Sequence, residues 1–391
     1  MQTTDLPAEY QEYSGLLELA ADFARREVEP VEIKGDAHES FDRGLFERAG
    51  ALGLTSIVAP EDWGGMGLGY GIYALILEEI ATASSAFAVT IAVNGLGQII
   101  LEKFGDDRQR KHWLSPLARG ERLGAFALTE AHCGSDAAAL KTSARKSGDR
   151  YIINGGKQFI THGGHADSYF VLARTQPLES GGASAHKGIS CFYVPGDAPG
   201  LSAGAQEKKL GWRSSPLSSL VFEDVEVPAD HLIGQEGDGF SIAMQALDSG
   251  RITIAATAVG IGRRALAESA RYAATREAFG EPLREFQGLQ WMLADMDTAL
   301  AAARLLVLEA AGRKDRGLPF AREASRAKLF ASDTAMRLAT DAVQVLGGYG
   351  YMREYPVEKL LRDAKATQIV EGTNQIQRSI IAKNLFREYV K

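Results

Sequence analysis

Apolar residues in the first third of the chain recur every three or four positions, which is the period of helices that bury one face. The clearest segments are residues 15–28, 75–83 and 91–104. A glycine-rich run at residues 58–69 interrupts them and cannot be helical throughout. We interpret this run as a loop that either connects two helices or contacts a ligand.

The pattern changes between about residues 122 and 234. Short runs of β-branched and aromatic residues, which favour strands, alternate there with turn residues. The predicted strands are residues 151–154, 168–174, 189–194 and 219–222. The predicted turns are Gly155-Gly156, Gly163-Gly164, Gly181-Gly182 and Pro195-Gly196-Asp197. The middle of the chain is therefore expected to form a small β domain.

Long helical patterns return after Gly239, at residues 240–275, 286–314 and 320–346. Each exceeds the average helix of about 11–12 residues, and helices of this length suit an antiparallel bundle. We therefore predict an α+β fold in three parts. These are an N-terminal α-helical domain (1–121), a middle β domain (122–235) and a C-terminal four-helix bundle domain (236–391).

Composition and charge narrow the class of protein. Of 391 residues, 45% are apolar and 24% are charged, as in ordinary globular proteins. A net charge of -7 argues against nucleic-acid and anionic-membrane partners. No apolar run approaches the roughly 20 residues of a membrane span. The acidic amino terminus resembles neither a signal nor a transit peptide, and cysteines are few, so we expect a cytoplasmic location.

Glu371 is the candidate catalytic base. It follows the apolar pair Ile369-Val370 and precedes Gly372, and Thr373-Asn374-Gln375 is predicted to begin a helix. Burial can raise a carboxyl pKa by up to about 3–5 units, toward the range that proton abstraction needs. Alternatively, Glu371 sits near a helix start for its dipole. Motifs upstream decide between these interpretations.

Residues 126–136 form the first of these motifs. An apolar segment from Phe126 to Leu128 leads into Thr129 and then Gly134-Ser135, whose hydroxyls and backbone amides suit a flat heterocycle or a pyrophosphate. His132 and Cys133 are adjacent and could indicate a metal or a nucleophile. No second Cys/His group or partner base is spaced for them, so we predict no metal site.

Three further groups could contact the same kind of ligand. Phe159 and Thr161 share a face of a predicted strand, which suits a planar ligand or a packing pair. Arg276, Phe279 and Gln287 lie near a helix break, as a phosphate and adenine clamp or as surface residues. Gln344 with Gly347-Gly348 could present an amide and close backbone, or could simply cap a helix.

These groups, in this order and followed by Glu371, resemble the acyl-CoA dehydrogenase family of flavoproteins over nearly the whole chain. Five matches in the family's order argue strongly against coincidence. The most specific matches are Leu128-Thr129-Glu130 with Gly134-Ser135-Asp136, Phe159-Ile160-Thr161, residues 276–280, residues 347–351, and Glu371-Gly372-Thr373 with residues 375–378.

The resemblance implies that FAD lies between the β domain and the C-terminal bundle. Thr129 and Thr161 would hydrogen-bond the isoalloxazine edge, with Phe159 against the ring. The ADP half of FAD would be held largely across a subunit interface, in a homotetramer built as a dimer of dimers. The expected cofactor-binding residues are Phe126, Leu128, Thr129, Gly134, Ser135, Phe159, Ile160, Thr161, Arg276, Phe279, Gln287, Gln344, Gly347, Gly348, Thr373 and Gln375.

The resemblance also implies the chemistry. Glu371 would remove the pro-R α-proton of an acyl-CoA thioester while the β-hydrogen leaves as hydride to flavin N5, giving the trans-2-enoyl-CoA. The amide of Glu371 and the FAD ribityl 2'-hydroxyl would bind the thioester carbonyl. Electrons would then pass to an electron-transfer flavoprotein.

The substrate site follows from the same resemblance. Some members carry the base on a bundle helix, just before an arginine, where this chain has Gly250, so Glu371 is the only family-consistent base. Asp248 and Arg251 would line the CoA channel. Ser135 and Gly372 are also expected to contact substrate.

This chain departs from the usual family pattern at several positions, which could alter flavin potential and pocket shape. These are Ala131, His132 and Cys133 for Pro-Gly-Ala, Phe159 for Trp, His162 for Asn and Val370 for Tyr. Residues 135–138, 208–212, 249–251 and 347–351 look most like short-chain and short branched-chain members, isobutyryl-CoA dehydrogenases in particular. Alternatives are a flavin oxidase of the same fold, a non-catalytic FAD-binding or acyl-carrier-binding scaffold, and a metalloenzyme centred on His132 and Cys133.

Overall fold

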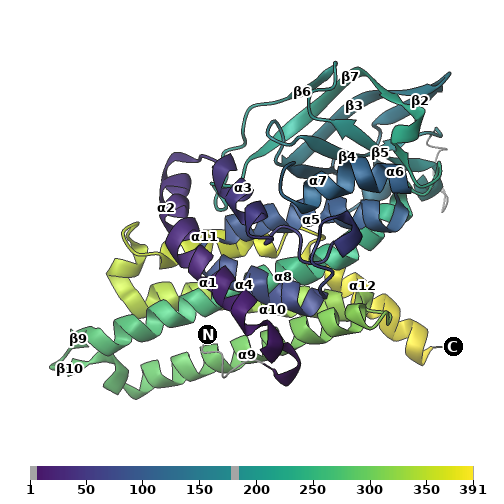
Figure 1. The fold of residues 1–391 in the computed structure, drawn as a ribbon. Coiled ribbons are helices and arrows are strands. Elements are labelled where there is room, and N and C mark those ends of the chain that lie inside the picture. The colour runs from purple at the N-terminus through teal and green to yellow at the C-terminus, as the bar shows by residue number, and fades with distance from the viewer. Residues whose placement is uncertain (1–6, 178–184, 391) are drawn as a thin grey trace.

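The computed structural model describes residues 7–177 and 185–390 and has helical, β and helical segments in that order (Figure 1). The N-terminal segment is helical where apolar residues recur at helical spacing, and the glycine-rich run at residues 58–69 is mainly a loop. The described helices of this segment are α1 (Ser14–Phe23), α2 (Glu29–His38), α3 (Arg43–Ala51), α4 (Tyr70–Ala83), α5 (Ser85–Phe104), α6 (Asp107–Gln109) and α7 (Ser115–Ala118).

The middle segment folds into one mixed sheet in the order β6-β7-β3-β2-β4-β5-β8, with β1 pairing in parallel with β4. The predicted strand at residues 168–174 is β4, and the other three predicted strands lie within β3, β5 and β7. The strands are β1 (Gly124–Ala127), β2 (Ser143–Ser147), β3 (Arg150–Thr161), β4 (Ser168–Arg174), β5 (Ile189–Pro195), β6 (Leu201–Ala203), β7 (Leu217–Pro228) and β8 (Leu232–Ile233).

The predicted turn at Gly155-Gly156 is wrong, because β3 continues through both glycines and pairs them with β7. Gly155 has a φ of +142° at a shift in the register of this pairing, and a Cβ on it would lie 2.7 Å from Thr142. Glycine here permits an irregular strand and a close approach rather than a chain reversal. The turns at residues 163–164 and 195–197 are confirmed, and Gly181-Gly182 lies outside the described residues.

The C-terminal segment is a bundle around α8, which is long and apolar on nearly every side. Residues 249–262 of α8 are all buried, as expected of a helix surrounded by other helices. Helices α4, α5, α9 and α10 pack against it. The elements of this segment are α8 (Gly239–Thr275), the hairpin β9 (Glu277–Ala278) and β10 (Glu281–Pro282), α9 (Gln287–Asp315), α10 (Ala321–Leu346), α11 (Val357–Thr367) and α12 (Asn374–Tyr389).

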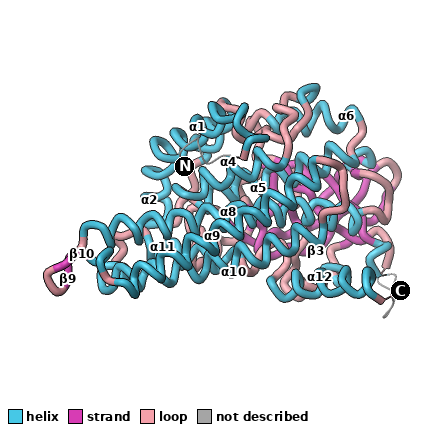
Figure 2. The backbone as a smooth tube through the Cα atoms, turned by 90° about the horizontal axis from the view of Figure 1, so that it is seen from below, coloured by secondary structure: helices cyan, strands magenta, loops and turns pink. Residues whose placement is uncertain are grey.

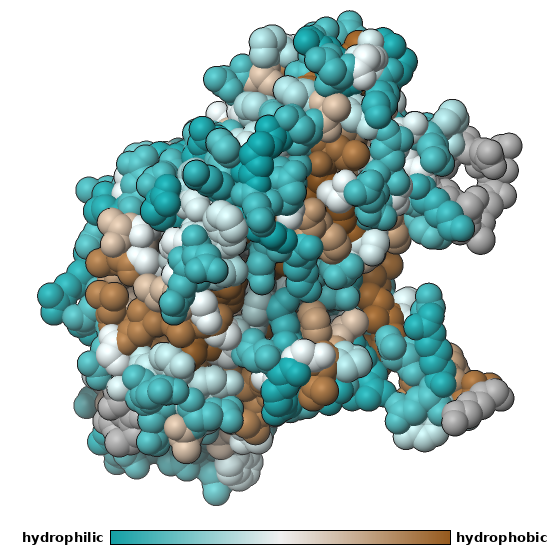
Figure 3. Space-filling view, turned by 45° about the vertical axis from the view of Figure 1, so that its right-hand side comes forward, coloured by the Kyte–Doolittle hydropathy of each residue, from teal (hydrophilic) through white to brown (hydrophobic). Residues whose placement is uncertain are grey.

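The two helical segments share one hydrophobic core, and the sheet has a core of its own. Figure 2 shows the strands of the sheet at one end of the helices and the β9–β10 hairpin at the other end. Figure 3 shows apolar side chains gathered in a hollow between the sheet and the C-terminal helices.

Helix α5 is, among the described helices, the one long and apolar enough to cross a membrane by composition. The expectation that no stretch approaches this length is therefore wrong by that measure. However, 89% of the stretch is buried within the protein, and it includes the buried polar residues Thr90, Asn94 and Gln98. Such burial is typical of a core helix.

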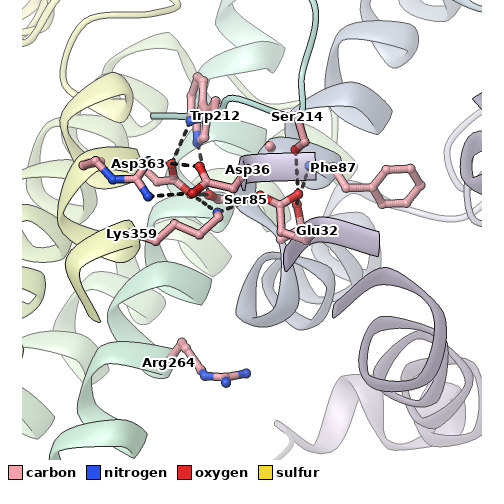
Figure 4. Close-up of polar contacts among 12 residues, drawn as sticks. Glu32, Asp36, Ser85, Phe87, Trp212, Ser214, Arg264, Lys359 and Asp363 are labelled. Atoms are coloured by element: carbon pink, nitrogen blue, oxygen red, sulfur yellow. Dashed lines mark hydrogen bonds and ion pairs between the residues drawn. The ribbon is translucent and has the colours of Figure 1, made fainter. Parts of the chain in front are cut away.

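A buried polar network joins the middle segment to the helices (Figure 4). The Trp212 amide donates to Asp363 at 2.7 Å and its indole N–H donates to Ser85 at 3.1 Å. Lys359 pairs with Glu32 at 2.7 Å, and Ser214 donates to the same carboxylate at 2.6 Å. These contacts fix the loop at residues 212–214 against α2, α5 and α11, beside the segment that carries Glu371.

Candidate active site

Glu371 lies in the short turn between α11 and α12, and its backbone is left-handed. Its φ is +54°, and Gly372 follows with a φ of +86°. Thr373 then caps α12, because its side chain accepts from the Ile376 amide at 3.4 Å. A non-glycine residue in this conformation is strained and persists only when its surroundings hold it there. The strain therefore marks the turn as a functional candidate.

Two side chains donate hydrogen bonds to the carbonyl oxygens of this turn, and neither was predicted from the sequence as a site residue. Gln377 donates to the carbonyl oxygens of Glu371 at 3.2 Å and Gly372 at 2.7 Å. Lys328 donates to the same Gly372 oxygen at 2.9 Å and to the Asn374 side chain at 2.9 Å. A signal for Lys328 was present, since it is the one charged residue among the buried residues of α10, which are otherwise mostly alanine, leucine and serine.

The carboxylate of Glu371 rests on Gly250 of α8. A Cβ added to Gly250 would lie 2.5 Å from Glu371 Oε2, so a side chain there would displace the carboxylate. Glu371 is half-buried as a residue, yet its Oε2 is buried without a hydrogen-bond partner. Burial raises the pKa of Glu371 to about 7, against the opposing effects of Arg251 and Lys328. The basicity of this carboxylate therefore suits proton abstraction near neutral pH.

The backbone amide of Glu371 is a free donor beside this base. In the part of the chain that the structure describes, no acceptor is bonded to the Glu371 N–H. An unpaired N–H next to a base can stabilise the oxyanion that forms when a proton leaves the carbon next to a carbonyl. The turn thus offers a base and an oxyanion donor from one residue.

Asp248 and Arg251 form an ion pair one turn apart on α8. Arg251 is buried and close enough to lower the pKa of both Glu371 and Lys328. Burial raises the pKa of Asp248. Their contact with CoA stays a prediction, as do the substrate contacts of Ser135 and Gly372.

The two motifs predicted to hold the flavin ring lie side by side. The Gln158 amide donates to the Thr129 carbonyl at 2.8 Å, and the buried Lys157 amine donates to the Leu128 carbonyl at 3.0 Å and to Glu130 at 2.8 Å. Phe159 is 59% exposed and Ile160 is buried, so the ring of Phe159 points away from the core. Phe159, like Glu371, is a non-glycine residue with positive φ, at +56°.

The other predicted cofactor residues differ in whether a side chain or only the backbone is accessible to a ligand. Leu128 and Ile160 turn their side chains into the core, so only their backbones remain for a ligand. Gly134 packs beside Thr129, and Ser135 is exposed next to it. Phe126 is half-buried in β1, Gln375 is exposed, and the Thr373 side chain caps α12.

Three of the residues predicted to hold the ADP half of FAD line a separate recess at the far end of the bundle. Arg276, Gly347 and Gly348 line a cavity of about 470 Å³ together with Tyr272 and Tyr349. Nearby, Phe279 is 97% exposed at the tip of the β9–β10 hairpin, and Gln287 and Gln344 are exposed. The structure thus brings Arg276 to the glycines, and Phe279 and Gln287 face outward.

Comparison with known proteins gives a consistent result. The chain matches the acyl-CoA dehydrogenase N-terminal domain over residues 11–121, the middle domain over residues 125–225 and the C-terminal domain over residues 237–386. It belongs to the acyl-CoA dehydrogenase family. An acyl-CoA dehydrogenase of Bacillus subtilis is 46% identical, covering 96% of this chain and 98% of that protein. Human mitochondrial short-chain specific acyl-CoA dehydrogenase is 44% identical, covering 99% and 92%.

Solved structures agree with this assignment. Butyryl-CoA dehydrogenase of Megasphaera elsdenii has a TM-score of 0.92 and 40% identity, covering 98% of this chain and 99% of that chain. A chain from work on the electron-transferring flavoprotein of Acidaminococcus fermentans has a TM-score of 0.94 and 42% identity, covering 98% and 99%. The predicted family and three-part fold are confirmed.

This acyl-CoA dehydrogenase is an FAD-dependent oxidoreductase that acts on acyl-CoA. When bound, FAD supplies the acceptor for a hydride. The residues present fit such a group: the exposed ring of Phe159 and the adjoining Thr129 segment suit the flavin ring, and the cavity at Arg276 suits a phosphate-containing half. Which residues contact FAD stays a prediction.

His162 and the cluster around His132 make contacts within the middle segment and with the N-terminal helical segment. His162 replaces a common asparagine, but its ring is buried, bonds to the Gly124 carbonyl at 2.7 Å and stacks on Phe41. Glu130, His132 and Cys133 bring potential ligand atoms within 4.8 Å of one another, so the structure adds Glu130 to the pair considered from the sequence. The Glu130 carboxylate, however, already accepts from Lys157 and from the backbone amides of residues 141 and 142. Glu130 therefore uses its carboxylate to join the two motifs that are predicted to hold the flavin.

Proposed function

We propose that this acyl-CoA dehydrogenase oxidises a short straight or short branched acyl-CoA to the trans-2-enoyl-CoA and passes the electrons to an electron-transfer flavoprotein. One observation carries the proposal: the carboxylate of Glu371 is buried on Gly250, next to its own free amide. This arrangement suits proton abstraction next to a thioester carbonyl.

The residues of the Glu371 turn have two roles in the proposed reaction. Glu371 accepts the α-proton, and its backbone N–H binds the thioester oxygen, where negative charge develops. The positive charge of Arg251 favours the ionised form of this base. FAD, when bound, would supply the acceptor for the hydride that leaves the β-carbon.

Apolar side chains beside the base support a short acyl chain. Val370, next to Glu371, packs with Val93 against a cluster that includes Val89, Trp212 and Ile254. These side chains occupy space beside the reacting carbon, which leaves less room for a long chain. The names of the similar proteins, short-chain specific and butyryl-CoA dehydrogenases, agree with this choice.

Two copies of the chain are needed to surround one FAD molecule in this proposal. From Gly250 to Arg276, the helix α8 rises about 39 Å, at 1.5 Å per residue. The β9–β10 hairpin also lies at the opposite end of the molecule from the sheet (Figure 1). Because one dinucleotide cannot reach both ends, the cavity at Arg276 would serve the flavin of a second subunit, within a homotetramer.

Anaerobic titration of the purified yellow protein tests the proposal. Straight acyl-CoAs of four to sixteen carbons and isobutyryl-CoA are added, and bleaching of the flavin band is followed. We expect full bleaching with four- and five-carbon substrates, slow reoxidation in air and rapid reoxidation by electron-transfer flavoprotein. Rapid reoxidation by oxygen would instead indicate an oxidase, and no bleaching with any substrate would indicate a scaffold.

A further inference from the structure

Helix α10 carries a lysine whose charge is buried without an ion-pair partner. Lys328 is 0% exposed and is surrounded on its own helix by the buried residues Ala324, Ala327 and Ala331. Its amine donates to two neutral oxygens, the Gly372 carbonyl and the Asn374 side chain, each at 2.9 Å. Burying an ammonium group is costly unless the charge is compensated.

The other described lysine that is buried, Lys157, does have an ion-pair partner. It contacts the Glu130 carboxylate at 2.8 Å, and the half-buried Lys359 contacts Glu32 at 2.7 Å. Within the described chain, no carboxylate forms such a contact with Lys328. The charges that face it are Glu371 from the turn, Asp333 from its own helix and Arg251 from α8.

Asp333 is already engaged by other donors. Its carboxylate accepts from the side chains of Gln368 and Asn374, each at 2.7 Å, and from Arg378 at 3.2 Å. This leaves the base itself as the anion with the fewest partners near Lys328, since its Oε2 has none. The favourable interaction that offsets burial of Lys328 is therefore available mainly from Glu371.

A purely structural role does not require a charged residue here. Gln377 already donates to the Gly372 carbonyl at 2.7 Å and to the Glu371 carbonyl at 3.2 Å, using a neutral amide. A second neutral donor would complete the same anchor at a lower desolvation cost. The presence of an amine therefore points to its charge.

We propose that Lys328 is a positioning residue for the catalytic base: its amine holds the Glu371–Gly372 turn, and its positive charge favours the ionised carboxylate of Glu371. This inference rests on the proposed function, in which Glu371 must be ionised to accept the α-proton. Lys328 itself touches neither the reacting carbon nor the proton.

The electrostatics agree with the geometry. Burial lowers the pKa of Lys328 to about 7, while Glu371 and Asp333 oppose that shift. Burial raises the pKa of Glu371 to about 7, and the charges of Arg251 and Lys328 oppose that rise. Removing the positive charge raises the pKa of Glu371, and the base is then protonated over more of the neutral range.

The test compares three substitutions at Lys328 in the FAD-loaded enzyme. Lys328→Gln keeps an N–H donor without the charge, Lys328→Met removes both, and Lys328→Arg keeps the charge. Lys34→Met, at an exposed position on α2, is the matched control. Single-turnover flavin reduction by butyryl-CoA is measured across the pH range, and circular dichroism and flavin content verify folding.

We expect the midpoint of the pH profile to rise in Lys328→Gln and Lys328→Met but not in Lys328→Arg. A rise of about one unit lowers the ionised fraction near pH 7 by about fivefold, and the rate recovers at higher pH. The control retains the wild-type midpoint. A loss of rate that is equal at every pH, or no change at all, would overturn the proposal.

A second readout does not depend on turnover. The carboxyl stretch of Glu371, identified by its absence in Glu371→Gln, is titrated by infrared difference spectroscopy. Loss of the lysine charge should move this titration to higher pH, and an unmoved titration contradicts the proposal. If wild-type flavin is not bleached by any acyl-CoA, the proposed function fails, but the infrared result still decides the role of Lys328.

Discussion

Glu371 and Gly250 lie in contact although 121 residues separate them in the chain, and a methyl group on Gly250 would be 2.5 Å from Glu371 Oε2. The carboxylate of Glu371 therefore occupies the space that a side chain at position 250 would fill. Since Gly250 carries no side chain that could act as a base, Glu371 stays the predicted base.

Gly250→Ala should disable the enzyme without unfolding it. The added methyl group displaces the carboxylate, and a displacement of about 1 Å in an active site can cost about 100-fold in rate. We expect flavin to remain bound and flavin reduction by butyryl-CoA to fall by roughly that factor. Gly312→Ala is the matched control, because nothing lies within 4 Å of that helical glycine. Equal rates in the two variants would show that the contact is unimportant.

Glu371→Gln should keep bound FAD and abolish turnover. A positioned general base contributes about 10²–10⁴-fold, so flavin bleaching in a stopped-flow experiment should slow by at least that range. The amide leaves the turn and its backbone donor in place, so acyl-CoA binding should persist in equilibrium titrations. Substantial residual dehydrogenation would assign the base elsewhere.

The same substitution should stabilise the protein at high pH. The folded-state pKa of Glu371 is raised from 4.5 to about 7, so the native state binds this proton more tightly than the unfolded state does. The stability linked to this proton is present below about pH 4.5 and is lost as pH rises toward 7. Relative to wild type, Glu371→Gln should therefore gain on the order of 2–3 kcal/mol across this window. Denaturant unfolding at several pH values measures the gap, and a gap that does not grow with pH contradicts the burial argument.

Lys157→Met should loosen the flavin site from within the β domain. Lys157 is buried and ties the Leu128 carbonyl and Glu130 to β3, and removal of one partner of such a pair costs about 3–5 kcal/mol. We expect a lower unfolding midpoint and loss of FAD during gel filtration. Lys146→Met, at an exposed position on β2, should change neither property.

Arg276→Ala should weaken FAD binding although it lies far from Glu371. A hydrogen bond to a charged group contributes about 1.5–3 kcal/mol, which corresponds to about 10- to 150-fold in Kd for FAD. Arg271→Ala, on the last turns of α8 just before Arg276 and 70% exposed, is the control. If both variants bind FAD equally well in fluorescence titrations, the cavity at Arg276 does not hold the cofactor.

Local sequence determined most of the secondary structure of this protein. The period of apolar positions predicts α8, α9 and α10 to within a residue or two, because each buries apolar faces against its neighbours. The strand at residues 168–174 is predicted with its observed bounds, since it is buried on both faces and rich in strand-forming residues. The turn at Gly155-Gly156 is predicted wrongly, because a glycine signal does not distinguish a reversal from an irregular strand.

Prediction of the active site required both the sequence and the tertiary structure. The order of motifs along the sequence determined the family and singled out Glu371. Only the tertiary structure decided the basicity of Glu371. Its pKa depends on burial and on the charges of Arg251 and Lys328, and its carboxylate occupies the space left by Gly250. These three residues are distant from Glu371 in the chain. The sequence shows Lys328 only as a charged residue on a helix face that is expected to be buried. Local sequence does not predict which turn packs against that face.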